Sequence, residues 1–157
     1  MVDTKELAEL SALAQQLNAQ SNNLNAYIEA LNNQLTVMNI GLEFYMNYPP
    51  LLATGKRLND HASPPTKYEE NTYLGWDKLG DKWQLAVKDV TTQYEWNDER
   101  GEEEVINNEG YTPLLKASRE IRLQAVEHFD DLIETLKMHV KGKLRQLKYA
   151  EQLAKLK

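Results

Sequence analysis

The chain has 157 residues, a formal net charge of −6 and no cysteine, which is the size of one domain by the usual prior of roughly 100–200 residues. The lack of cysteine excludes disulfides, thiolate metal sites, iron–sulfur clusters and a cysteine nucleophile. No apolar run reaches the roughly 18 residues of a membrane span, and the first ten residues do not resemble a signal peptide. We therefore expect a cytoplasmic single-domain protein without a membrane segment.

Residues 1–48 carry the clearest pattern, an apolar line whose spacing alternates between three and four. A period of 3.5 residues keeps one face of a helix turned toward a partner helix, as in a coiled coil. The pattern predicts one long heptad helix over residues 1–48. Apart from Ser21, the line is formed by Leu7, Leu10, Ala14, Leu17, Leu24, Ile28, Leu31, Leu35, Met38, Leu42 and Tyr45.

A second line beside the first consists of asparagines that recur every seven residues, namely Asn18, Asn25, Asn32 and Asn39. Coiled coils usually have Glu and Lys at such flanking positions, and asparagine is a mediocre helix former. Two interpretations are open. The amides either form a ladder that bonds across to a partner helix or form a solvated polar face.

The middle of the chain reads as a loop followed by a small sheet. Four prolines in residues 49–71 predict a connecting loop. Aromatic and β-branched residues in 72–111 predict an antiparallel β head, with strands at Thr72–Lys78 and Lys82–Val90 and a turn at Gly80. We also expect a short third strand at Thr91–Trp96 and a return strand near Val105.

Residues 112–157 predict a second long helix. Thr112 is a suitable N-cap and Pro113 a suitable first helical residue, while Ala117-Ser118 marks a kink or a restart. A broad apolar stripe follows with a helical period. It consists of Leu114, Leu115, Ile121, Val126, Phe129, Leu132, Ile133, Leu136, Val140, Leu144, Leu147 and Ala154.

These elements predict an α+β fold that is mainly helical. Two long antiparallel helices form a coiled-coil-like hairpin, and the β head is inserted between them. Residues 1–50 carry a net charge of −4 and residues 113–157 a net charge of +4, so the two helices attract each other. Because each helix of a hairpin touches only one neighbour, apolar surface is left over, and we expect a homodimer or higher oligomer in the form of a helical bundle.

The sequence offers no recognisable catalytic site. It contains none of the common nucleophile or phosphate-binding motifs. His128 and His139 are eleven residues apart on one predicted helix, about 16 Å at ~1.5 Å per residue, which is too far to share a metal. His61 lies in the Pro-rich loop. We predict no enzyme, no metal and no cofactor, and keep only as a third alternative an enzyme that uses His128, Asp131 or Glu134.

A basic stripe on the last helix could in principle contact nucleic acid phosphates. It comprises Lys137, Lys141, Arg145 and Lys148. Only one aromatic residue, Tyr149, accompanies the stripe, and the whole chain is acidic. We therefore interpret it as a solvated face that attracts the acidic first helix, and do not expect DNA or RNA binding.

Aromatic residues concentrate in the predicted head, which contains Trp76, Trp83 and Trp96. Buried aromatic side chains often form the core of a small sheet, but they also line pockets and partner surfaces. Arg119 and Arg122 follow the head and could clamp an anionic ligand there. Two functions follow: a non-enzymatic oligomeric scaffold that presents the head to a protein partner, or a binder of a small anionic, nucleotide-like molecule between the head and the last helix.

Overall fold

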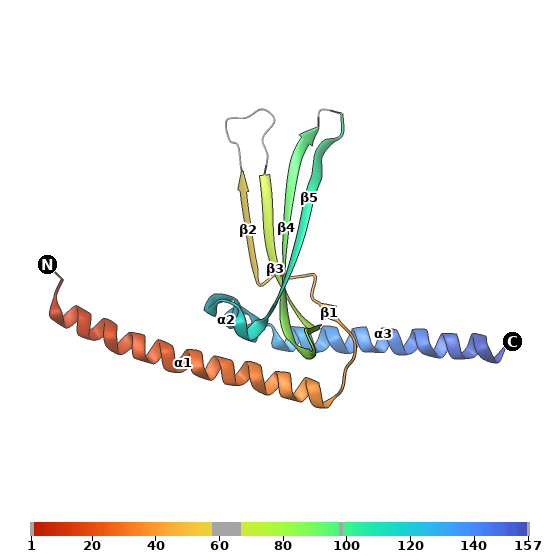
Figure 1. Cartoon of the computed structure of the whole chain (residues 1–157), viewed down its shortest axis with the longest axis horizontal. Coiled ribbons are helices and arrows are strands. Elements are labelled where there is room, and N and C mark those ends of the chain that lie inside the picture. The colour runs from red at the N-terminus through yellow and green to blue at the C-terminus, as the bar shows by residue number, and fades with distance from the viewer. Residues whose placement is uncertain (1, 58–66, 98, 157) are drawn as a thin grey trace.

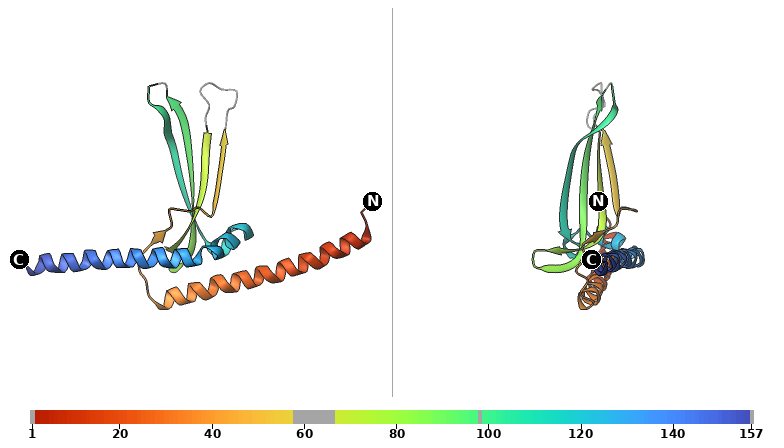
Figure 2. Two further views of the ribbon diagram at one scale, coloured as in Figure 1. Left: turned by 180° about the vertical axis from the view of Figure 1, so that it is seen from behind. Right: turned by 90° about the vertical axis from the view of Figure 1, so that its right-hand side faces the viewer.

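The computed structural model describes residues 2–57, 67–97 and 99–156, with the side chains of residues 56, 57, 96, 97 and 102–106 left out. The fold is α+β: helices support a sheet that rises from one side of them (Figures 1 and 2). In chain order the described elements are α1 (Thr4–Val37), β1 (Phe44–Tyr45), β2 (Leu52–Arg57), β3 (Lys67–Leu79), β4 (Lys82–Asn97), β5 (Gly101–Pro113), the short 3-10 helix η1 (Leu114–Lys116), α2 (Arg119–Glu127) and α3 (Phe129–Lys155).

The sheet is antiparallel and longer than the sequence predicted. The strands β3, β4 and β5 follow one another, and both β1 and β2 pair with β3. The predicted turn is confirmed, because Gly80 joins β3 to β4 with φ of +66°, which glycine adopts cheaply. The prediction of a separate strand at Thr91–Trp96 was wrong, because those residues continue β4. Part of the predicted loop also proves to be strand, since residues 49–71 contain β2 and the start of β3.

The core lies where one face of the sheet meets the helices. Side chains of successive strand residues alternate between faces, and the even-numbered β3 residues Leu74 and Trp76 are buried with Leu85 and Val87 of β4. The helices contribute buried apolar residues to the same cluster, namely Leu24, Ile28 and Leu35 from α1, Ala125 from α2, and Leu132 and Leu136 from α3.

The first helix begins as its sequence suggests but ends early. Asp3 is the N-cap, and its carboxylate accepts a hydrogen bond from the Lys5 amide at 3.0 Å. The helix was predicted over residues 1–48 but ends at Val37, because Asn39 has φ of +54° and turns the chain. Asparagine tolerates this left-handed conformation better than most residues. Of the seam residues that follow, Tyr45 enters β1 instead of extending the helix.

The last helix consists of separate pieces, so the predicted start at Thr112-Pro113 was wrong. Pro113 is the last residue of β5, where it pairs with Ala86 of β4. The restart at Ser118 is confirmed: its hydroxyl accepts a hydrogen bond from the Ile121 amide at 3.3 Å and caps α2. A break at His128 separates α2 from α3.

The prediction of an antiparallel helical hairpin was also wrong, because α2 and α3 run in the same direction as α1. Arg119 bonds Asn18, and Arg122, further along α2, bonds Asn25, further along α1. Still further along, Leu35 shares a hollow with Leu136 of α3. Sequence periodicity does not encode direction. The chain leaves the sheet beside the middle of α1 and then continues in the direction of α1, so the two termini lie at opposite ends of the molecule (Figures 1 and 2).

Candidate interaction surfaces

The asparagine line of α1 faces the rest of the protein. The side-chain oxygen of Asn18 accepts a hydrogen bond from Arg119 at 3.4 Å, and that of Asn25 accepts a short one from Arg122. Both guanidinium groups therefore face α1 and not the β head, contrary to the predicted anion clamp. For these two asparagines, the arrangement supports the interpretation of the line as amides that bond across to a partner helix, here α2.

The next asparagine joins α1 to the sheet. Asn32 is buried, and its side-chain oxygen accepts a hydrogen bond from the Leu85 amide at 2.7 Å. Leu85 lies just beyond the last β4–β5 pair, Ala86 with Pro113, where a backbone N–H needs a partner other than β5. Three members of the asparagine line therefore hydrogen-bond to α2 or to the sheet, and the fourth, Asn39, turns the chain at the end of α1. The seven-residue spacing indicated that the asparagines share one face of the helix, but it could not predict that their partners are two arginines and a strand amide.

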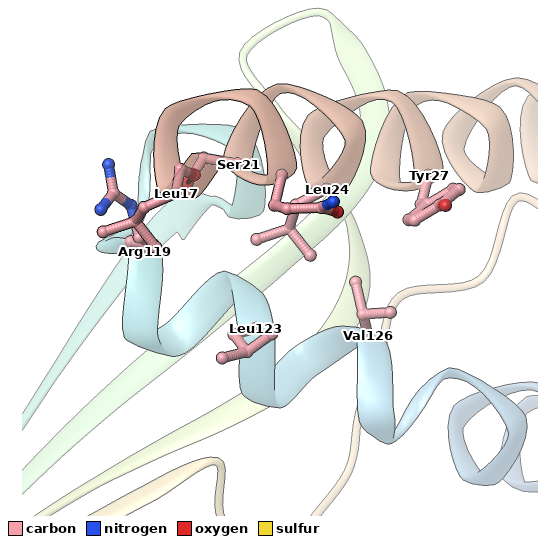
Figure 3. A pocket seen from close by; sticks show the side chains of 8 residues that line it. Leu17, Ser21, Leu24, Tyr27, Arg119, Leu123 and Val126 are labelled. Carbon is pink, nitrogen blue, oxygen red and sulfur yellow. Dashed lines mark hydrogen bonds between the residues drawn. The ribbon is translucent and has the colours of Figure 1, made fainter. Parts of the chain in front are cut away.

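A groove of about 230 Å³ runs between α1 and α2 (Figure 3). Its lining is mainly apolar and continues the exposed seam of α1 inward to the buried Leu24. The side chains that line it are Leu17, Gln20, Ser21, Leu24 and Tyr27 of α1 and Arg119, Leu123 and Val126 of α2. The groove therefore connects an exposed apolar surface with the core.

The three tryptophans do not form one site. Trp76 is fully buried and donates through Nε1 to the Ile40 carbonyl at 3.1 Å, so it is a core residue and has no surface to offer a partner. Trp83 is half-buried and stacks on Trp76 with ring centroids 6.2 Å apart. Trp96 lies thirteen residues further along β4, about 43 Å away at ~3.3 Å per residue, so it cannot share a pocket with Trp83. The Trp96 side chain is outside the described part of the structure.

A second hollow lies between the end of α1 and α3 and measures about 310 Å³. Its apolar lining comes from Leu35, Met38, Ile40, Ile133, Leu136 and Val140. Lys137 and Lys141, two members of the basic stripe, also line it. Such a combination suits a molecule with an apolar body and an anionic end. By contrast, the hollow beside Trp76 and Trp83 measures only about 60 Å³.

The face of the sheet turned away from the helices carries a tyrosine cluster. Tyr45 covers Gly75 so closely that a Cβ there would collide with its ring. The Tyr45 hydroxyl donates to Asp77 at 2.7 Å, its ring lies 5.6 Å from that of Tyr111, and the Lys88 ammonium is 5.2 Å from its centroid. The second oxygen of the buried Asp77 carboxylate accepts a hydrogen bond from the Lys78 amide at 2.7 Å, so both oxygens have a donor.

Burial, reinforced by the bond to Asp77, raises the pKa of the Tyr45 phenol well above its usual value. The hydrogen bond from its hydroxyl to Glu109 is the main cause that raises the pKa of Tyr111 to about 12. Both phenols donate hydrogen bonds in the protonated form, and the raised pKa keeps them in that form to a higher pH than for a free tyrosine. The cluster is a structural network with one exposed ring, that of Tyr111.

Both long helices extend beyond the fold. The outer part of α1 exposes Leu7, Leu10, Leu13 and Leu17, each at 51–61%. The outer part of α3, at the other end of the molecule, exposes Leu144, Leu147, Tyr149 and Leu153. We call residues 4–17 the N-overhang and residues 142–155 the C-overhang. Apolar rows of this kind mark interaction surfaces in soluble proteins.

The residues considered for catalysis are dispersed. The Nδ1 atom of His128 lies 3.2 Å from Asp131 at the junction of α2 and α3, and the His139 ring packs on Phe44. His61 lies outside the described residues. Among residues 2–57, 67–97 and 99–156, no group of three His, Asp or Glu side chains could hold a metal. In the same ranges, neither α1 nor α3 has a stretch apolar enough to cross a membrane.

No protein-family model, curated protein or solved structure matches this chain.

Proposed function

We propose that this chain is a non-enzymatic interaction protein that self-associates through its helices and presents its β sheet to a protein partner. One observation carries the proposal: the apolar seam of α1, interrupted only at Ser21, continues from a buried inner half to an exposed N-overhang. None of the residues that the structure describes covers this outer part of the seam, and an exposed apolar surface of this kind favours contact with another molecule.

The shape of the molecule supports the second half of the proposal. The sheet rises from one side of the helices, so association through the helices leaves it accessible (Figures 1 and 2). On the outward face, hydrogen bonding and ring contacts position Tyr45 and Asp77, and the Tyr111 ring remains exposed.

The mass of the full chain in solution tests the proposal. We expect a mass of at least twice 18.1 kDa by light scattering at micromolar concentration, and the mass of a single chain for a Leu10→Gln, Leu147→Gln double variant. The control Val37→Gln changes a more exposed apolar residue that lies outside both overhangs, and should retain the wild-type mass. A single-chain mass for the wild type at every concentration would refute self-association.

A second candidate is a binder of amphiphilic anions, favoured by the hollow beside Lys137 and Lys141. A carboxylate would sit near the two ammonium groups while its alkyl chain fills the apolar lining. Laurate should raise the melting temperature, and uncharged lauryl alcohol should raise it less. A Lys137→Gln, Lys141→Gln variant should lose that difference. Equal effects of both compounds on the wild type would leave no role for the lysines.

A further inference from the structure

We infer that a second copy of this chain covers the overhangs in a reciprocal, antiparallel way: the N-overhang of each copy lies along the C-overhang of the other. This inference rests on the proposed self-association and specifies which surfaces meet. It makes the assembly a closed dimer with a four-helix middle.

Charge selects the partner. The N-overhang contains two acidic residues and one lysine and follows the acidic N-cap Asp3, whereas the C-overhang contains four basic residues and one glutamate. Two N-overhangs side by side would place Glu6 and Glu9 near their own copies, and two C-overhangs would bring lysines together. Only the unlike pairing sets opposite charges beside the apolar contact.

The direction of the helices makes the contact intermolecular. An antiparallel hairpin would have brought the C-terminal lysines beside Glu6 and Glu9 of the same chain. Because α1 and α3 run in the same direction, these groups lie at opposite ends of one molecule. The charge attraction that the sequence indicates between its two ends is therefore available only between copies.

The lengths of the overhangs allow both contacts to form at once. Each spans fourteen residues, about 21 Å at ~1.5 Å per residue. A two-fold axis perpendicular to the helices, between the two copies and level with the middle of each, then relates the two unlike pairs to each other. In that register Leu7 lies near Leu153 of the second copy, and Leu17 near its Leu144. A closed two-fold dimer leaves no overhang uncovered, whereas parallel docking would leave one free at each end of an open chain.

Cysteine pairing tests this register directly, because the chain has no cysteine of its own. Leu7→Cys protein mixed with Leu153→Cys protein should form a disulfide-linked dimer under mild oxidation, since a disulfide requires Cα atoms about 4.4–6.8 Å apart. Each variant alone should remain uncrosslinked, because the two-fold axis places like positions far apart. All these residues are exposed, and circular dichroism will confirm that helix content is unchanged.

The alternative pairings have distinct outcomes. Crosslinking of Leu7→Cys with Leu144→Cys in preference to Leu153→Cys would mean parallel docking and overturn the proposal. Crosslinking of Leu7→Cys with itself would mean that like overhangs meet, which also overturns it. Either result would leave the proposed self-association standing, whereas a single-chain mass for the wild type would remove both.

Charge reversal provides an independent test. A Glu6→Lys, Glu9→Lys variant should dimerise with a dissociation constant between about threefold and tenfold higher, because exposed ion pairs contribute little each. Mixing it with a Lys148→Glu, Lys155→Glu variant should restore association. The control is a mixture of the Glu6→Lys, Glu9→Lys variant with wild-type protein. If the Lys148→Glu, Lys155→Glu variant associates with it no more tightly than the wild type does, the charges do not determine which overhangs pair.

Discussion

The inner and outer halves of α1 follow the same apolar repeat, but only the inner half is buried. Ile28 is 0% exposed against the sheet and the other helices, whereas Leu10, eighteen residues earlier on the same seam, is 61% exposed. Local sequence therefore determines that this segment is helical and which face is apolar. Burial depends on what the rest of the chain brings beside that face.

The largest expected effect comes from this pair of residues. Ile28→Ala should lower the free energy of unfolding by about 2–5 kcal/mol, since it removes buried methyl groups and leaves a cavity. Leu10→Ala should change it by less than about 0.5 kcal/mol at concentrations where single chains dominate. Urea unfolding at low protein concentration measures both. Equal losses would mean that the outer half of α1 is packed within the single chain.

Two neighbouring asparagines allow the same comparison of a buried with an exposed position of α1, with a smaller expected loss of unfolding free energy. Asn32→Ala should cost about 1–3 kcal/mol because it leaves the Leu85 amide buried without an acceptor. Asn33→Ala, one residue along and exposed, is the matched control and should be nearly neutral. The same unfolding experiment distinguishes them. A neutral Asn32→Ala would show that the bond from α1 to β4 does not contribute to stability.

The tyrosine cluster adds an effect that depends on pH. The folded-state pKa of Tyr45 lies above its usual 10.0, so its contribution to stability is present below pH 10 and is lost as pH rises further. The loss should stay below the limit of about 1.4 kcal/mol per pH unit for one group, because the ring is partly open to solvent. Tyr45→Phe should show a shallower alkaline decline in melting temperature. Identical slopes for wild type and variant would contradict the role of this phenol.

Features set by neighbouring residues could be predicted from the sequence. The turn at Gly80 and the restart at Ser118 depend on local chemistry, namely a positive φ and a capping hydroxyl. The end of α1 could not be predicted, because Met38, Leu42 and Tyr45 extend the heptad pattern while the chain uses Tyr45 in the sheet.

The candidate site was predicted less well, for a physical reason. An aromatic side chain or a guanidinium group has the same composition whether it faces a ligand or its own fold. Trp76 proved to be core, and Arg119 and Arg122 bond the asparagines of α1. The overhangs were visible in the sequence only as apolar seams. Their exposure depends on helix direction, which composition and periodicity do not encode.

Crosslinking of Leu7→Cys protein with Leu153→Cys protein, detected by mass, is the most direct test of the antiparallel contact between the N-overhang of one copy and the C-overhang of the other. We expect a linked dimer from the mixture and none from either variant alone. No linked dimer from the mixture, at a concentration where light scattering shows the wild type to be dimeric, would contradict it.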